Sequence, residues 1–132
     1  MTQVFSIENY EVVVANRNEV IDVFGLDKCG CEKCIVVYNN EVLLVTCVEK
    51  GKIWASFVMG KLKEPMNIVT KLINIKNVVF CNIINPALIE KLKNIKKIFK
   101  IPDDKHGEET ICIEVEWEAT HSENVASSYM YQ

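Results

Sequence analysis

A chain of 132 residues has room for one globular domain built around one hydrophobic core. With 49% hydrophobic and 25% charged residues, the composition is that of a folded domain and excludes a disordered chain. The net charge of −3 argues against general nucleic-acid binding, and no segment stays apolar over the length that a membrane span needs. We therefore expect one domain that acts neither in a membrane nor on nucleic acid.

The N-terminal segment and the cysteines together predict the redox state. Met1–Tyr10 lacks a basic segment followed by a continuous apolar one, so we expect no secretory signal peptide. Proteins kept in a reducing compartment hold their cysteines as thiols. We therefore expect the six cysteines to be thiols and not disulfides.

The first quarter of the chain predicts a strand, a short helix and a loop. Val4–Ala15 is rich in β-branched residues and predicts one opening strand. Asn16–Glu19 supplies residues that cap helices, and the following apolar residues predict a short helix that Gly25 ends. Leu26–Lys33, which holds most of a cysteine cluster, is expected to form a loop.

Three apolar segments then follow one another closely. They are Cys34–Tyr38, Val42–Val48 and Ile53–Met59, and each has the length and composition of a strand. Asn39-Asn40 tolerates a positive φ angle and predicts a tight turn, and the Gly-containing Glu49–Lys52 predicts the next one. The three segments therefore predict an antiparallel meander that is covered on both faces.

A helix and a buried strand are predicted after the meander. Pro65–Ile75 has apolar residues at helical spacing, with Pro65 at the start, and Lys76–Ile84 reads as an apolar strand. Because a helix connects them, the third meander strand and this strand are expected to be parallel neighbours. Asn85 and Pro86 then predict the start of a second helix, with Leu88, Leu92 and Ile95 on one face.

The last elements predict a hairpin followed by a tail. Lys97–Ile101 predicts a short strand that Pro102 closes, and Ile111–Trp117 alternates apolar and polar residues as a half-buried strand does. Residues 1–118 are thus expected to form a single α/β (α+β) domain, with a mixed, mostly antiparallel sheet flanked by helices. Residues 119–132 are expected to form a separate C-terminal tail, a possible docking arm.

This order of elements resembles the GNAT superfamily of acyl-CoA-dependent N-acetyltransferases over nearly the whole domain. The meander followed by helix, strand and helix is the core of that fold. Asn85–Phe99 resembles the closing motif of the family, although no Gly precedes Phe99 here. Bacteriophages carry GNAT-like proteins that have lost catalytic features, and this chain is similar to those in kind.

The departures from the family pattern concern the cofactor. Active members hold the pyrophosphate of coenzyme A on the N–H groups of a Gly-rich loop before the first helix that follows the meander. In the matching segment here, Gly60 is the one remaining Gly, Glu64 adds a negative charge and Pro65 lacks an N–H group. If coenzyme A binds at all, the resemblance implies that Gly60, Lys61, Lys63 and Asn85 hold it.

The residues of acyl-transfer chemistry are also missing from the pattern. The family often uses a Tyr of its last helix as the general acid, and the matching position is about Leu92, which has no proton to give. Glu49 or Glu114 could serve as a general base by position, but nothing in the sequence singles either out. We therefore predict no catalytic residue.

The cysteine cluster Cys29-Gly-Cys31-Glu-Lys-Cys34 has the spacing of a zinc knuckle. Cys29, Cys31 and Cys34 are candidate metal ligands, and a fourth ligand would have to come from a distant part of the chain. The residues that offer such a ligand are Cys47, Cys81, Cys112, His106 and His121. The alternative is that the cysteines inside apolar strands act as small hydrophobic residues.

Three functions remain open from the sequence. The first is a non-catalytic, GNAT-like phage protein that acts through protein–protein contacts, as a virion component or a host-factor binder, in the virion or the host cytoplasm. Its tail would anchor a partner, or a second copy in self-assembly, through Tyr129, Met130 and Tyr131. The second is an active N-acetyltransferase that uses acetyl-CoA. The third is a zinc-stabilised regulator of host transcription or defence, suggested by the cysteines and a lysine-rich surface.

Overall fold

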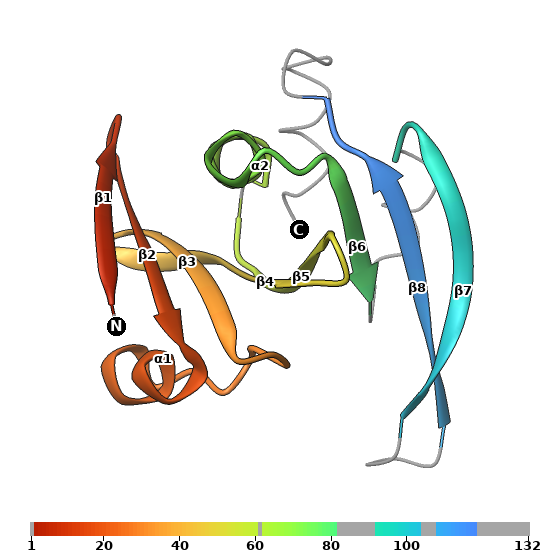
Figure 1. Ribbon diagram of the computed structural model, residues 1–132, viewed down its shortest axis with the longest axis horizontal. Helices are drawn as coiled ribbons and strands as arrows, with labels where there is room; N and C mark the ends of the chain where they lie inside the picture. Colours follow the sequence, from red (N-terminus) through yellow and green to blue (C-terminus); the bar gives the residue numbers. More distant parts are fainter. Residues whose placement is uncertain (1, 61, 82–91, 104–107, 119–132) are drawn as a thin grey trace.

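The computed structural model of the chain describes residues 2–60, 62–81, 92–103 and 108–118. These residues form a single α+β domain with one eight-stranded, mostly antiparallel sheet and two helices (Figure 1). The elements in chain order are β1 (Gln3–Ile7), β2 (Tyr10–Asn16), α1 (Arg17–Phe24), β3 (Lys33–Asn39), β4 (Glu41–Glu49), β5 (Lys52–Val58), α2 (Lys63–Ile73), β6 (Asn77–Cys81), β7 (Ile95–Asp103) and β8 (Glu108–Glu116).

The strands lie in the order β1-β2-β3-β4-β5-β6-β8-β7 across a strongly twisted sheet. All neighbours are antiparallel except β5 and β6, which helix α2 connects and which run parallel. This confirms the predicted meander, the predicted crossover and the predicted terminal hairpin of β7 and β8. The hairpin folds back so that β8, and not β7, pairs with β6.

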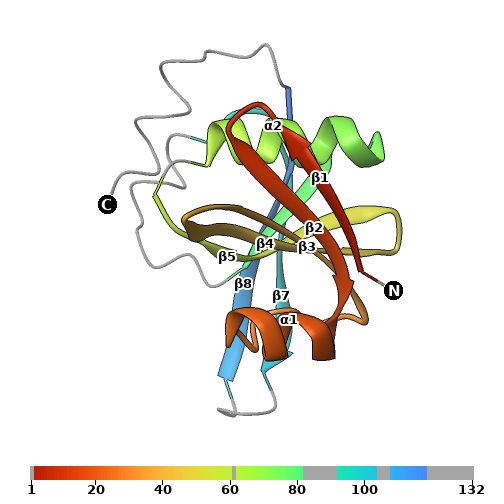
Figure 2. The same ribbon diagram turned by 90° about the vertical axis from the view of Figure 1, so that its left-hand side faces the viewer.

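The two helices cover opposite faces of the sheet, as Figure 2 shows. Helix α2 packs Met66 and Val69 on a core that includes Ile35 and Val37 of β3. Helix α1 packs Val20 on the other face. Since successive side chains of a strand point to opposite faces, the apolar strand β3 contributes to both cores.

Helix α1 has the boundaries that its capping residues predict. The side chain of Asn16 accepts a hydrogen bond from the N–H of Glu19 (2.8 Å), and the Glu19 side chain accepts one from the N–H of Asn16 (3.2 Å). Gly25 takes the left-handed conformation with φ +67° and ends the helix. Local side chains are therefore sufficient to start and stop this helix.

Two predicted boundaries in the first two thirds of the chain are wrong. The single strand Val4–Ala15 is a hairpin of β1 and β2, because Glu8 takes a left-handed φ of +55° and turns the chain. Helix α2 begins at Lys63, so Pro65 is its third residue and not its first. Pro65 still lies in the first turn, where a missing N–H breaks no helical hydrogen bond.

The predicted end of the last helix is also wrong, although Asn85, Pro86 and Leu88 lie outside the described residues. Leu92 is not helical, and strand β7 begins at Ile95. Strand β8 offers nine residues for pairing, so β7 extends well beyond the predicted Lys97–Ile101. Pro102 falls inside β7, which is tolerated because β7 is an edge strand. Within the described part of the chain, neither helix has the length and apolar character needed to cross a bilayer.

Candidate functional site

The predicted cofactor residues lie at and before the N-terminus of α2. Gly60 has a φ of +74° and turns the chain from β5 toward the helix. Lys63 is the first residue of α2 and is only 7% exposed. Lys61 and Asn85 lie outside the described residues. The structure therefore places Gly60 and Lys63 near one helix end, but Lys63 is buried there.

Few backbone donors remain at this end of α2. Pro65 contributes no N–H, and the N–H of Met66 is bonded to the carbonyl of Leu62 at 2.9 Å. At most two of the first four helical positions can therefore donate to a ligand. Leu62 occupies the N-cap position, makes no side-chain cap and is buried. A helix end built in this way is a poor phosphate site, because such sites depend on several converging N–H groups.

A carboxylate occupies the same helix end. Glu64 lies in the first turn of α2 and accepts a hydrogen bond from the hydroxyl of Tyr10 on β2. Burial, together with the hydrogen bond and the negative charge of Glu64, raises the pKa of Tyr10 to about 12. The positive end of the helix dipole favours an anion, and this anion is part of the protein.

The two base candidates lie on different strands, and Glu114 is engaged in an ion pair. Glu114 on β8 is buried and forms an ion pair with Lys52 on β5, with 2.6 Å between Nζ and Oε1. Glu49 is exposed at the end of β4. The Lys52 ammonium group compensates the charge of the buried Glu114 carboxylate. The pair stabilises the sheet between β5 and β8 and explains why Glu114 is buried.

The described pairing of strands β5 and β6 is short. Their pairing covers three residue pairs, from Ile53 with Val78 to Ala55 with Phe80, while β5 continues to Val58. The register of β5 against β4 also shifts near this point. Strand β6 is described as far as Cys81, so the pairing of β5 with β6 is described as far as Ala55, next to the N-terminus of α2.

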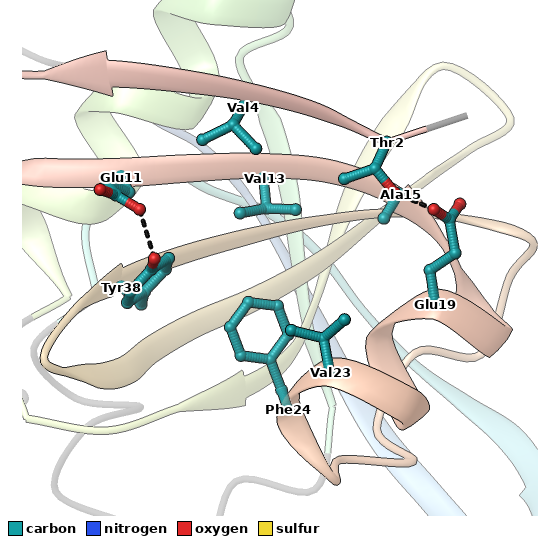
Figure 3. Close-up of a pocket in the computed structure, with 9 residues that line it drawn as sticks. All are labelled: Thr2, Val4, Glu11, Val13, Ala15, Glu19, Val23, Phe24 and Tyr38. Atoms are coloured by element: carbon teal, nitrogen blue, oxygen red, sulfur yellow. Dashed lines mark hydrogen bonds between the residues drawn. The ribbon is translucent and has the colours of Figure 1, made fainter.

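A recess lies between α1 and the first three strands (Figure 3). It has a volume of about 180 Å³, which is below the range of about 300–1,000 Å³ that is typical of small-molecule sites. We call it the α1 groove. It is lined by Thr2, Val4, Glu11, Val13, Ala15, Glu19, Val23, Phe24 and Tyr38.

The α1 groove is apolar in the middle and acidic at both ends. At one end Tyr38 donates a hydrogen bond to Glu11, which raises the pKa of Tyr38. At the other end Thr2 donates to Glu19. No lining residue carries a positive charge. The groove could not be predicted from the sequence, because it needs the β1–β2 turn, for which Asn9 was the one local signal.

The exposed apolar side chains of this region have no covering element among the described residues. Val23 on α1 is 73% exposed and Val4 on β1 is 58% exposed. Strand β1 is an edge strand, so one side of its backbone lacks a partner strand in the described sheet. Apolar side chains beside an open strand edge are characteristic of surfaces that bind other proteins.

Four cysteines meet where the loop after α1 reaches β3 and β4. Cys29 and Cys34 form a disulfide, and the Sγ atoms of Cys29 and Cys47 are 2.8 Å apart. Cys31 lies with them, and the sulfurs of Cys29, Cys31 and Cys47 are all within 4.8 Å of one another. Burial and the neighbouring Cys47 raise the pKa of the Cys31 thiol to about 12. The predicted candidates Cys29, Cys31 and Cys34 are thus brought together, and Cys47 joins them.

The expectation that all six cysteines are thiols is wrong for four of them. Cys81 on β6 and Cys112 on β8 form the second disulfide, with Cα atoms 4.2 Å apart, as directly opposed residues of neighbouring antiparallel strands. Cys31 and Cys47 are free. The predicted tail residues Tyr129, Met130 and Tyr131, and the ligand candidates His106 and His121, lie outside the described residues.

A scan against protein-family models matched no family, and searches of curated proteins and of solved structures found no match.

Proposed function

We propose that this protein has a GNAT-like domain without acyl-transfer activity that acts by binding a protein partner. The strand order supports the GNAT-like part of the proposal, because a meander is joined through a helix to a parallel strand and a terminal hairpin. A bacteriophage origin, and a place in the virion or the host cytoplasm, are part of the same proposal.

The observation that best supports a loss of acyl-transfer activity is the hydrogen bond between Tyr10 and Glu64. Coenzyme A brings a negatively charged pyrophosphate, which in this fold would have to approach the N-terminus of α2. There it meets the Glu64 carboxylate, which Tyr10 holds in place, and a turn that lacks the N–H of Pro65. Each of these features weakens phosphate binding, and both act at the same helix end.

The α1 groove supports the choice of a protein as the ligand. Its small volume suits an apolar side chain of a partner, and its acidic ends suit basic residues on either side of that anchor. Strand β1 offers backbone hydrogen bonds along its open edge. We therefore propose an extended peptide segment with an apolar anchor flanked by Lys or Arg.

A displayed library of random peptides tests this proposal, with the full chain as bait. We expect enrichment of apolar anchors flanked by basic residues on the wild type, and loss of enrichment on the Val23→Asp variant. Ile111→Asp is the matched control, because Ile111 is also an exposed apolar residue, at 50%, but lies on β8. Enrichment that survives Val23→Asp, or that depends on Ile111, would contradict binding at the α1 groove.

A second candidate function is acyl-CoA-dependent N-acetyl transfer, and the GNAT-like order of the meander, helix α2 and the parallel strand β6 favours it. Calorimetry with acetyl-CoA separates the two candidates. We expect no saturable heat from the wild type, and a clear binding isotherm would overturn the non-catalytic proposal. If such binding occurs and Glu64 opposes it, Glu64→Gln should tighten it.

A further inference from the structure

We propose that Cys29, Cys31, Cys34 and Cys47 form a tetrathiolate zinc site when the Cys29–Cys34 disulfide is reduced. This inference does not depend on the proposed partner binding or on the absence of acyl transfer. It identifies Cys47 as the fourth ligand, which the sequence could not choose among five candidates.

The sulfur positions carry the inference. A tetrahedral zinc site with Zn–S bonds of about 2.3 Å places its sulfurs about 3.8 Å apart. The sulfurs of Cys29, Cys31 and Cys47 already lie within 4.8 Å of one another, and the sulfur of Cys34 is bonded to that of Cys29. The four sulfurs therefore lie in one cluster, and side-chain movements after the disulfide opens can bring them to the spacing that zinc requires.

The fold provides two of the four ligands from rigid positions. Cys34 on β3 and Cys47 on β4 are directly opposed residues of the antiparallel pair, so their side chains share a face. The other two ligands come from the loop that precedes β3. A hydrogen bond from the N–H of Arg17 to the carbonyl of Glu32 (3.0 Å) fixes this loop against the start of α1. Four Cys ligands are one of the tetrahedral sets that structural zinc sites use.

The surroundings suit a closed structural site. Cys29, Cys34 and Cys47 are each at most 2% exposed, which leaves little space for a water ligand. Four soft thiolates in a tetrahedral arrangement select zinc over magnesium or calcium.

The Cys29–Cys34 disulfide must be reduced before zinc can bind, and a dithiol can supply the electrons and protons for this step. A dithiol transfers two electrons and two protons to the Cys29–Cys34 disulfide, so that this S–S bond breaks while the dithiol forms its own. Zinc then binds the four sulfurs and releases the protons of the thiols. The cluster would thus exist in an oxidised form without metal and in a reduced form with zinc.

The test uses the full chain, purified under a dithiol reductant with zinc supplied and then freed of loose metal. We expect about one zinc ion per chain. After exchange with Co²⁺, we expect the intense visible absorption of a tetrahedral cobalt–thiolate centre. Loss of a group that only hydrogen-bonds to a metal ligand can weaken metal binding by roughly 100-fold. Cys47→Ser removes a ligand itself, so we expect it to weaken zinc binding by more than this. Cys81→Ala/Cys112→Ala is the matched control and should bind zinc as the wild type does.

Two results would overturn the site. One is a protein whose Cys29 and Cys34 are fully reduced but that retains no zinc, which would leave thiol–disulfide exchange as the chemistry of the cluster. The other is a Cys47→Ser variant with unchanged zinc affinity and an unchanged cobalt spectrum. Because both readouts follow the metal directly, neither depends on the proposed partner or on any activity.

Discussion

The hydroxyl of Tyr10 on β2 is hydrogen-bonded to the carboxylate of Glu64 in the first turn of α2, across 54 positions of the chain. This contact joins the N-terminal hairpin to the helix that connects β5 and β6. It also places a fixed negative charge at the helix end where the GNAT-like interpretation would require a phosphate. One contact thus contributes to stability and bears on function.

The pH dependence of stability should report this contact. The pKa of Tyr10 is raised to about 12 in the folded state, against 10.0 for the ordinary side chain. Below pH 10 both states keep the proton and the contribution is fully present. Between pH 10 and about 12 the unfolded chain loses the proton first, so the free energy of unfolding falls as the pH rises. Denaturant titrations at several pH values should show this fall, and Tyr10→Phe should reduce it, leaving the part that the raised pKa of Tyr38 contributes.

A spectroscopic titration of tyrosine ionisation tests how far Glu64, in addition to burial, raises the pKa of Tyr10. Glu64→Gln removes the acceptor charge and should lower the pKa of Tyr10 toward 10. Glu11→Gln is the control, because Glu11 acts on Tyr38 and should leave the Tyr10 step unchanged. An unchanged Tyr10 step in the Glu64→Gln variant would mean that burial alone raises this pKa.

The capping box of α1 gives a second prediction. Asn16→Ala removes the side-chain acceptor for the N–H of Glu19 and should lower the free energy of unfolding by about 1 kcal/mol. Urea unfolding followed by circular dichroism measures this loss. Asn18→Ala is the matched control, because Asn18 is exposed inside the helix, where Ala has the higher helix propensity. Equal destabilisation by both substitutions would contradict a specific role of the cap.

Features set by neighbouring residues could be predicted from the sequence. Helix α1 follows from Asn16 and Gly25, and the β4–β5 turn follows from Lys50-Gly51, both of which take positive φ angles. The parallel pairing of β5 and β6 could also be predicted, because two neighbouring strands that a helix connects usually run parallel.

Features set by distant residues could not be predicted. The start of β7 at Ile95 depends on the length of its partner β8, while the local spacing from Leu88 to Ile95 fits a helix equally well. The choice of Cys47 beside Cys34 depends on the register of β3 against β4. The contact of Glu64 with Tyr10 required the unpredicted turn at Glu8. In each case the decisive partner lies in another part of the chain.

The ion pair of Lys52 and Glu114 gives a third prediction. The Glu114 side chain is 8% exposed and the Lys52 side chain 31%, so Lys52→Met leaves a largely buried carboxylate without its ammonium partner. We expect a loss of about 2 kcal/mol in the free energy of unfolding, less than for a fully buried pair because water reaches Lys52. Denaturant unfolding at neutral pH measures this loss.

The matched control is the exposed pair of Lys100 and Glu109, whose side chains are each 65% exposed. Lys100→Met should change the stability by less than about 0.5 kcal/mol, as exposed pairs contribute little. The double variant Lys52→Met/Glu114→Leu should recover much of the loss, because no buried charge remains. A double variant as unstable as Lys52→Met would show that packing, and not charge, is responsible.

The disulfide of Cys81 and Cys112 gives the last prediction. It joins residues 31 positions apart, and the chain-entropy model assigns a loop of this length about 3–4 kcal/mol of stabilisation. Cys81→Ala/Cys112→Ala should therefore lower the free energy of unfolding by about this amount when wild type and variant are compared without reductant. Under a dithiol the difference should vanish, because the Cys81–Cys112 bond of the wild type is then reduced too. The Cys29–Cys34 disulfide opens in both proteins, so its effect cancels. A difference that persists under reduction would assign the loss to packing between β6 and β8 and not to the covalent bond.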